Sequence, residues 1–161
     1  MRISVIAFGK LRTPGMRLAA DHYLKGLRFW TSVEEIELKP IFVPDKSLEM
    51  RRQIQCKEAD LLLEQVSKRK GPLYLLDEDG KALSSQGWAK LLKGAEDSSA
   101  QGLIFCIGSS LGFSDGVRAS AAEIISLGPH TLPHELARVV LCEQLFRATS
   151  ILKGHPYHNE G

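Results

Sequence analysis

The sequence is poor in cysteine and has no long apolar run. Only 3 of its 161 residues are cysteines, and Cys56, Cys106 and Cys142 lie far apart, with no Cys-x-x-Cys pair among them. This pattern disfavours a disulfide framework, so we expect three buried free thiols that pack as small apolar side chains. No apolar run approaches the roughly 20 residues of a membrane-spanning helix, and the stretch at residues 3–8 is too short for a signal peptide. These absences predict a cytoplasmic protein with no membrane partner.

Neither sign of charge is in large excess. The chain has 21 Lys and Arg against 19 Asp and Glu, a formal net charge of +2. This balance neither requires nor excludes a nucleic-acid partner, because binding depends on where charges cluster. Hydrophobic residues make up 43% and charged residues 25%, as in an ordinary globular protein. With no repeat, linker or low-complexity segment, this length predicts one domain over residues 1–161.

Strand patterns alternate with helix patterns along the chain. The runs at 72–76 and 102–107 are apolar without alternation, which is typical of central parallel strands covered on both faces. Helix-length segments follow or separate such runs, so we predict an α/β fold with a parallel sheet. Strands are expected at residues 2–8, 33–38, 72–76, 102–107 and 123–127, and helices at 14–30, 44–70 and 135–152.

Three loops are expected to surround one ligand crevice. Parallel sheets bind ligands outside the carboxyl ends of their strands, which places the loops after Leu76, Ile107 and Leu127 around the same cavity. The loop from Gly108 to Gly112 lacks the Gly-x-Gly-x-x-Gly spacing, and the chain has no Gly-Lys-Ser/Thr phosphate cradle. A common dinucleotide or P-loop nucleotide is therefore disfavoured. Small loop residues suit an adenosine held by main-chain amides, although a simple turn is the alternative.

Two histidines flank a proline just before the last helix. His130 and His134 have a spacing that could bind a metal on a helix, but Pro133 opposes a helix through both and fits better at a helix start. No acidic third ligand stands nearby, so we predict no metal. A substrate or cofactor contact and an ordinary structural hydrogen bond both remain open. His155 and His158, in the short tail, are either solvated or functional.

The last helix is apolar over more than one stripe. A helix of this kind is buried on several sides, either within the fold or against a second subunit. Glu143 and Arg147 stand four residues apart in it, a spacing that permits an ion pair on one helix face.

A set of short motifs extends along the chain: Leu76-Asp77-Glu78-x-Gly80, Ile107-Gly108 with Gly112, Ser126-Leu127, Thr131-Leu132-Pro133-His134, Arg138-Val139, Glu143-Gln144-Leu145, Arg147-Ala148 and Pro156-Tyr157-His158. Together these motifs resemble the RlmH family of SPOUT-class RNA methyltransferases. The resemblance implies S-adenosylmethionine-dependent methylation of N3 of a pseudouridine in large-subunit (23S) ribosomal RNA, on assembled ribosomes. It also implies a homodimer and a parallel-sheet SPOUT (α/β-knot) fold with a C-terminal trefoil knot, an exception to the rule that chains do not thread their own loops.

The resemblance implies a set of site residues. A group that assists loss of the N3 proton must reach it directly or through one water. Arg138 could pair with phosphate or with charge on the base, and Tyr157 could stack or hydrogen bond. No general base is assigned. The candidate catalytic residues are His134, Arg138, Tyr157 and His158. The implied cofactor contacts are Leu76, Gly108, Ser109, Pro129, His130, Thr131, Leu132, Pro133 and His134.

Two departures from the family pattern lie at these sites. Ser109 replaces the second glycine of a family pair, adding a side chain beside the cofactor. The tail ends Asn159-Glu160-Gly161, where the family commonly has a basic residue that could pair with phosphate. Other basic residues could instead supply an RNA surface: Lys10, Arg12, Lys25, Arg28 and Lys153.

Two alternative functions follow from these observations. The departures motivate a ribosome-binding assembly factor that keeps the cofactor pocket without turnover. A small-molecule α/β enzyme with another adenosine cofactor is the third hypothesis. Methyl incorporation and ribosome association distinguish the three.

Overall fold

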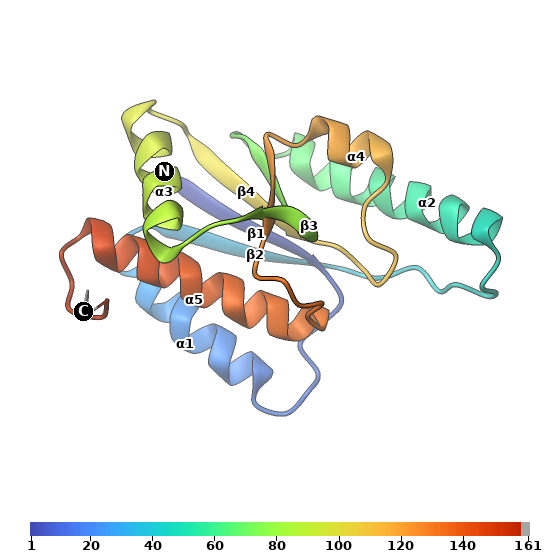
Figure 1. The fold of residues 1–161 in the computed structure, drawn as a ribbon, viewed down its shortest axis with the longest axis horizontal. Helices are drawn as coiled ribbons and strands as arrows, with labels where there is room; N and C mark the ends of the chain where they lie inside the picture. Colours follow the sequence, from blue (N-terminus) through green and yellow to red (C-terminus); the bar gives the residue numbers. More distant parts are fainter. Residues whose placement is uncertain (159–161) are drawn as a thin grey trace.

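A five-stranded parallel sheet forms the centre of the molecule (Figure 1). The computed structural model describes residues 1–158. The strands run in the order β2-β1-β4-β3-β5, and each paired neighbour is parallel. The predicted α/β fold is therefore confirmed. The strands are β1 (Arg2–Phe8), β2 (Ser32–Leu38), β3 (Leu73–Ala82), β4 (Gly102–Ile107) and β5 (Glu123–Ser126).

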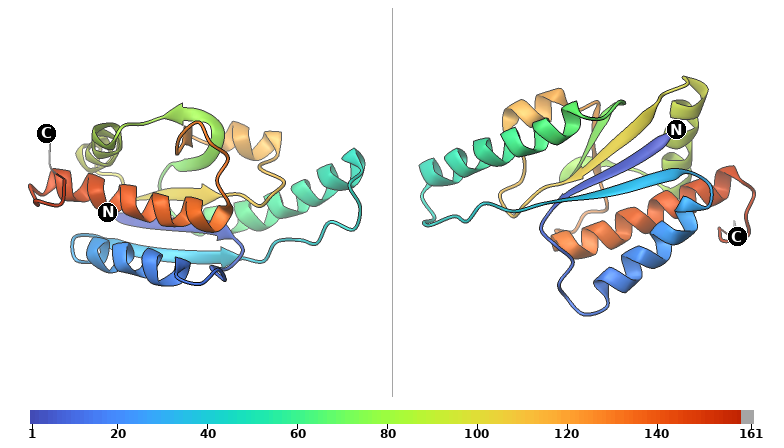
Figure 2. Two further views of the ribbon diagram at one scale, coloured as in Figure 1. Left: turned by 60° about the horizontal axis from the view of Figure 1, so that its bottom comes forward. Right: turned by 180° about the vertical axis from the view of Figure 1, so that it is seen from behind.

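Helices cover both faces of the sheet. One face carries α1, α3 and α5, and the other carries α2 and α4 (Figures 1 and 2). The first two helices are shorter than predicted, because Gly15 and Ser47 occupy their N-cap positions. The Ser47 hydroxyl accepts a hydrogen bond from Met50 N at 3.2 Å, as expected of an N-cap serine. The helices are α1 (Met16–Arg28), α2 (Leu48–Ser67), α3 (Ser85–Asp97), α4 (Asp115–Ser120) and α5 (His134–Leu152).

The central strands contribute side chains to two apolar clusters, one on each face of the sheet. In β4, Phe105 packs toward α3 and α5, whereas Ile104 and Cys106 pack toward α2 and α4. Both faces of the strand are buried, which explains why its sequence is apolar without alternation.

The β3 strand continues beyond its predicted end. Residues 77–80 do not terminate it, and the pairing with β5 shifts register between Leu76 and Lys81. Gly80 lies so close to β5 that an added Cβ would meet the carbonyl carbon of Ile125 at 2.6 Å. Glycine is needed for this close approach, so the apparent turn is an irregularity within the strand.

The burial of the three cysteines differs from the prediction at one position. Cys106 and Cys142 are buried free thiols, but Cys56 is exposed, so its predicted burial is wrong. Cys56 lies on the outward face of α2, whereas Ile54 and Leu62 of the same helix are buried. Helix pattern alone did not identify which α2 face meets the sheet. Strand order does not by itself define threading, so the trefoil knot stays a prediction.

Candidate active site

One pocket lies at the predicted crevice. Its volume is about 650 Å³, within the range of small-molecule sites. The loops after β4 and β5 contribute, as expected for a parallel sheet, and the first turn of α5 closes one side. The predicted loop after Leu76 is part of β3, and residues 76–78 of that strand line the pocket. The lining residues are Leu76, Asp77, Glu78, Ile107, Gly108, Ser109, Ser110, Leu111, Gly112, Phe113, Leu127, Gly128, His130, Thr131, Leu132, Pro133, His134 and Ala137.

Eight of the nine implied cofactor contacts line this pocket; Pro129 does not, and is exposed. The sequence analysis missed Phe113 and Ala137. A Cβ added to Gly108 would meet the Phe113 ring at 3.2 Å, so Phe113 packs directly beneath the loop. Ala137 lies about one helical turn after His134, and that spacing was the available signal for it.

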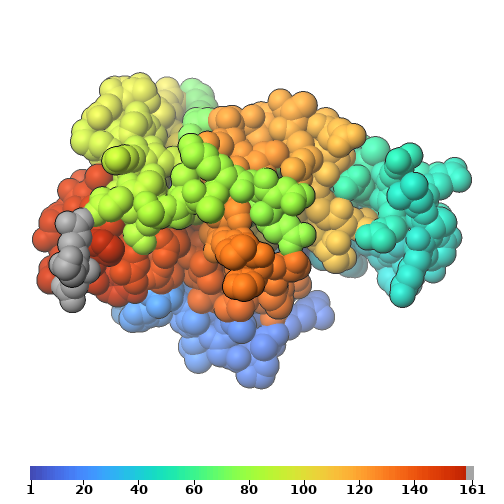
Figure 3. Space-filling view, in the orientation of Figure 1, coloured from blue at the N-terminus to red at the C-terminus, as the bar shows by residue number. Residues whose placement is uncertain are grey.

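Polar contacts tie the pocket loops to one another. The Thr131 hydroxyl hydrogen bonds the Glu78 carboxylate, which joins the loop after β5 to β3. Segments 77–82 (green) and 128–133 (orange) lie together on the face drawn in Figure 3. Asp77 in turn pairs with Arg118 of α4 at 2.7 Å. These contacts hold segments that are far apart in sequence at one rim.

Ser109 lines the pocket without strain. Its hydroxyl donates to Glu58 Oε2 at 2.5 Å and accepts from Leu111 N at 3.2 Å. Among the residues that the structure describes, Ser99 is the non-glycine residue with positive φ. The backbone at position 109 therefore does not require the glycine of the family pattern.

His134 is exposed at the first position of α5, on the pocket wall. Its ring lies over Gly9, the residue that follows β1. Pro133 precedes it at the N-cap, so α5 begins one residue before the predicted start at position 135. His130 stays in the loop, so no helix runs through both histidines.

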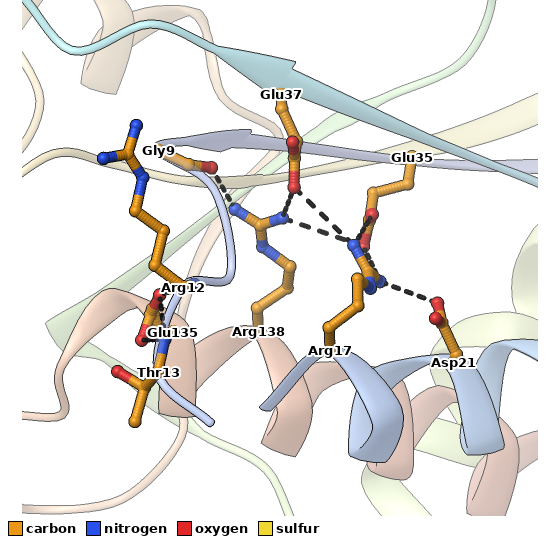
Figure 4. A network of polar contacts seen from close by, with 9 residues as sticks. All are labelled: Gly9, Arg12, Thr13, Arg17, Asp21, Glu35, Glu37, Glu135 and Arg138. Atoms are coloured by element: carbon orange, nitrogen blue, oxygen red, sulfur yellow. Dashed lines mark hydrogen bonds and ion pairs between the residues drawn. The ribbon is translucent and has the colours of Figure 1, made fainter. Parts of the chain in front are cut away.

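Arg138 lies one turn further along α5 and has no exposed surface. Its guanidinium donates to Glu37 Oε1 at 2.6 Å and to the carbonyl of Gly9 (Figure 4). It does not line the pocket. The structure thus places Arg138 beneath the site, away from where it could touch an RNA phosphate or a base, contrary to the role considered from the sequence.

Charged side chains surround Arg138 between β2, α1 and α5 (Figure 4). Arg17 pairs with Glu35 at 2.5 Å and with Asp21 at 3.0 Å. The hydrogen bond to Glu35 raises the pKa of Arg17. Arg17 therefore stays charged, in a network that joins three elements.

Glu135 fastens the loop after β1 to the start of α5. Its carboxylate accepts hydrogen bonds from the amides of Arg12 and Thr13. Hydrogen bonding from Thr13, together with the Arg12 amide, lowers the pKa of Glu135. The loop that carries Gly9 is thus held at both ends, by β1 and by α5.

Tyr157 and His158 lie at the opposite end of α5 from His134. The Tyr157 hydroxyl donates to Glu143 at 3.0 Å, the Arg147 guanidinium lies 4.8 Å from the Tyr157 ring centre, and His158 Nδ1 is 3.3 Å from Arg147. Burial and hydrogen bonding raise the pKa of Tyr157. The predicted Glu143–Arg147 pair is present. Neither Tyr157 nor His158 lines the pocket, because the tail lies against Glu143 and Arg147, roughly 14 and 20 Å along α5 from His134.

Other classes of site were also considered. No group of three metal-ligating side chains occurs within residues 1–158. No helix in this described part is long and apolar enough to cross a membrane.

The fold and pocket define an α/β protein with a cavity of small-molecule size at the carboxyl ends of parallel strands. The chain belongs to the SPOUT methyltransferase family: the family described as "Predicted SPOUT methyltransferase" matches residues 1–158.

Similar proteins agree with this assignment. Ribosomal RNA large subunit methyltransferase H of Solidesulfovibrio magneticus is 40% identical over 157 residues, and its namesake in Koribacter versatilis is 38% identical over 159 residues; 98% of each chain is covered.

Solved structures with low sequence identity share the fold. A probable methyltransferase from Bordetella pertussis matches with a TM-score of 0.53 at 13% identity, covering 91% of this chain and 95% of that one. A putative RNA methyltransferase from Bacillus anthracis matches with a TM-score of 0.52 at 11% identity, covering 98% of both chains. The resemblance to the RlmH family drawn from the sequence is confirmed.

Proposed function

We propose that this protein transfers a methyl group from S-adenosylmethionine to N3 of a pseudouridine in 23S ribosomal RNA, on assembled ribosomes in the cytoplasm. The observation that carries the proposal is the pocket with His134 on its wall. The names of the relatives from two bacteria support a ribosomal RNA substrate. The family motifs on the pocket loops support the particular base.

The pocket residues fit the proposed cofactor. The apolar side chains of Leu76 in β3, Ile107 in β4 and Leu132 in the loop before α5 suit an adenine ring. The small residues of the 108–112 loop let main-chain groups approach a ligand closely. Asp77 and Glu78 place carboxylates at the edge of the pocket, where they suit the positive charge of the methionine portion. When bound, the cofactor supplies a methyl group already activated by its sulfonium.

The protein's own contribution is orientation and removal of one proton. Holding the imide nitrogen in line with the methyl group can supply roughly 7 to 11 kcal/mol in favourable cases. His134 is exposed at the pocket wall, so its imidazole can accept the N3 proton directly or through one water. The Thr131–Glu78 contact at the rim limits movement of the loop that carries the substrate-facing residues.

Arg138 acts as a positioning residue in this proposal. It binds the Gly9 carbonyl, and Gly9 supports the His134 ring. Its ion pair with Glu37 at 2.6 Å fixes the guanidinium, so the residue sets where His134 lies without touching RNA.

A second copy of the chain completes each site. Tyr157 and His158 contact Glu143 and Arg147, roughly 14 to 20 Å along α5 from His134 of their own chain, and neither lines its pocket. An antiparallel pairing of two α5 helices would bring the tail of one subunit to the pocket of the other. Leu136 and Val140 are only half-buried on α5, which supports an interface there. This homodimer makes Tyr157 and His158 part of the partner's site.

Exposed cations adjoin the pocket on the side of α2. Residues 39–57, which we term the basic arm, contain five basic and two acidic residues, a net charge of +3 within a chain of net +2. None of the five forms an ion pair with a described residue. Such a surface suits RNA phosphates. The five are Lys39, Lys46, Arg51, Arg52 and Lys57.

The basic residues considered from the sequence divide between two ends of the molecule. Lys10 and Arg12 lie in the loop after β1, at the pocket end, whereas Lys25, Arg28 and Lys153 lie at or after the C-terminal ends of α1 and α5. Asn159 and the two residues after it lie outside the described residues.

The single-domain boundary and the knot complete the proposal. We infer that residues 1–161 act as one domain, because its sheet includes strands from residue 2 to residue 126. The trefoil knot implied by the family would thread the segment leading into α5, which also lines the pocket.

One experiment tests the reaction. A labelled methyl group is offered from S-adenosylmethionine to ribosomes that lack the modification, and the ribosomal RNA is analysed by mass spectrometry. Label on an N3-methylated pseudouridine is expected. Cofactor and ribosome binding without label would instead support the assembly factor, and no ribosome association would support a small-molecule enzyme. Ser109 does not favour the assembly factor, because its hydroxyl is bound to Glu58.

A further inference from the structure

A buried carboxylate on α2 holds the cofactor loop from outside the pocket. Glu58 is only 3% exposed, and both of its oxygens are engaged. Oε1 accepts from Ile41 N at 3.0 Å, and Oε2 accepts from the Ser109 hydroxyl at 2.5 Å. Glu58 itself does not line the pocket, so it meets the site only through Ser109.

A second side chain of α2 reaches the same loop. Gln55 Nε2 donates to the Leu111 carbonyl at 2.9 Å, and Leu111 N donates to the Ser109 hydroxyl at 3.2 Å. Gln55 and Glu58 are three residues apart, so they lie on one helix face. The loop is therefore fixed at Ser109 and Leu111 by a single turn of α2.

We propose that Glu58 is a positioning residue that holds the 108–112 loop ready for the cofactor through its hydrogen bond with Ser109. The proposal rests on the proposed function for the identity of the cofactor. Hydrogen bonds to an ionised group are about twice as strong as neutral ones, and a loop already in its bound conformation loses less freedom on binding. Cofactor affinity in this chain thus depends on a residue that never touches the cofactor.

The family pattern suggests that glycine at position 109 suits the cofactor best, and the proposal predicts the opposite for this chain. Replacing Ser109 by glycine matches the family pattern, but it removes the hydrogen bond to Oε2 of a buried carboxylate and leaves only the Ile41 amide on the other oxygen; a buried polar atom without its partner is costly. Nothing in the backbone at position 109 requires glycine, because Ser109 has no positive φ. Ser109→Gly is therefore expected to weaken cofactor binding in this protein instead of improving it.

A double-mutant cycle tests the pair in the full chain. S-adenosylmethionine is titrated calorimetrically into wild type, Ser109→Gly, Glu58→Gln and the double variant. Each single change is expected to raise Kd about 5- to 20-fold, because part of the energy of one hydrogen bond to a charged group is lost from the preorganised loop. The double variant is expected to be no weaker than the weaker single variant, because both changes weaken the same contact.

Further measurements separate positioning from general stability. Ser109→Thr keeps the hydroxyl and should retain wild-type affinity. Glu64→Gln removes an exposed carboxylate from the same helix and serves as the matched control. In the Ser109→Gly variant, KM for the cofactor should rise while kcat at saturation and KM for ribosomes stay unchanged.

Each outcome bears on one of the two proposals. Wild-type affinity in both single variants, or additive losses in the double variant, would overturn the role of Glu58. The expected coupling without methyl transfer to ribosomes would overturn the proposed reaction alone. A wild-type chain that does not bind S-adenosylmethionine would overturn both.

Discussion

The imidazole of His134 rests on the backbone of Gly9: a Cβ added at Gly9 would lie 2.9 Å from His134 Nε2. Gly9 has a φ of +89°, a conformation that side chains disfavour. The end of β1 and the start of α5, which are 125 residues apart in the sequence, thus form one corner of the pocket. The side chain missing from Gly9 is what leaves room for the histidine.

Replacing Gly9 by alanine should displace His134. We expect a loss of roughly 1 to 2 kcal/mol in the free energy of unfolding, because alanine disfavours the left-handed backbone. Methyl transfer by the folded variant should also fall, because the His134 ring is displaced. Gly94→Ala is the control, because Gly94 lies in α3 with nothing near its Cβ position; it should stabilise the fold by about 0.5 to 1 kcal/mol. Unchanged methyl transfer in Gly9→Ala would remove His134 from the mechanism.

Replacing Arg138 should affect folding together with activity. Arg138→Ala removes a fully buried guanidinium and its hydrogen bonds to Glu37 and the Gly9 carbonyl, which is expected to cost about 1.5 to 3 kcal/mol, the size of a hydrogen bond to a charged group. Arg138→Lys keeps the charge, but one ammonium cannot reproduce the planar guanidinium fork. Urea denaturation measures the loss of stability in Arg138→Ala, and methyl transfer measures the loss of activity in Arg138→Lys. A stable, inactive Arg138→Ala would argue for direct contact with RNA.

Glu135 should make stability depend on acidic pH. Its pKa is lowered in the folded protein, so the unfolded chain binds protons more readily. The stabilising contribution is present above the unfolded pKa of about 4.3 and is lost as the pH falls through the lower, folded value. Glu135→Gln should destabilise the protein at pH 7 but much less at pH 3. A pH-independent difference in thermal unfolding would contradict this.

Thiol labelling should distinguish the three cysteines. Cys56 is exposed, whereas burial raises the pKa of Cys106 and raises that of Cys142 to about 12. Because the thiolate is the reactive form, a maleimide should label Cys56 rapidly in the native protein and the other two only on unfolding. A Cys56→Ser variant should show no rapid phase. Rapid labelling of two or more thiols per chain would be inconsistent with the burial of Cys106 in β4 and Cys142 in α5.

The basic arm should contribute to ribosome affinity. The double variant Arg51→Gln with Arg52→Gln is expected to raise KM for ribosomes. The slope of a plot of log KM against log salt concentration should fall by roughly 1 to 2, about one unit for each lost phosphate contact. Cofactor Kd should not change. Lys70→Gln with Lys90→Gln removes equal charge elsewhere and is the control. Equal effects from both pairs would indicate a general charge effect instead of a docking surface.

Much of the architecture followed from local pattern. The unalternating runs of β3 and β4 predicted buried parallel strands, which the structure confirms. The carboxyl-end rule placed the pocket correctly at the loops after β4 and β5, whereas the predicted loop after Leu76 is part of β3. Both inferences depend on hydrophobicity and on sheet geometry, which short segments of sequence carry. Family motifs then supplied the reaction class, which composition could not.

The tertiary structure alone decided how these segments meet. The sequence marked Arg138 as notable but did not reveal that Glu37 and Gly9 bind it beneath the pocket. Nor did it suggest Glu58, whose importance arises from a contact with Ser109 across 51 residues. The sequence by itself determined the elements, because their patterns are local. Only the packed fold decided which side chains are buried together, because those contacts join elements whose relative placement no local pattern encodes.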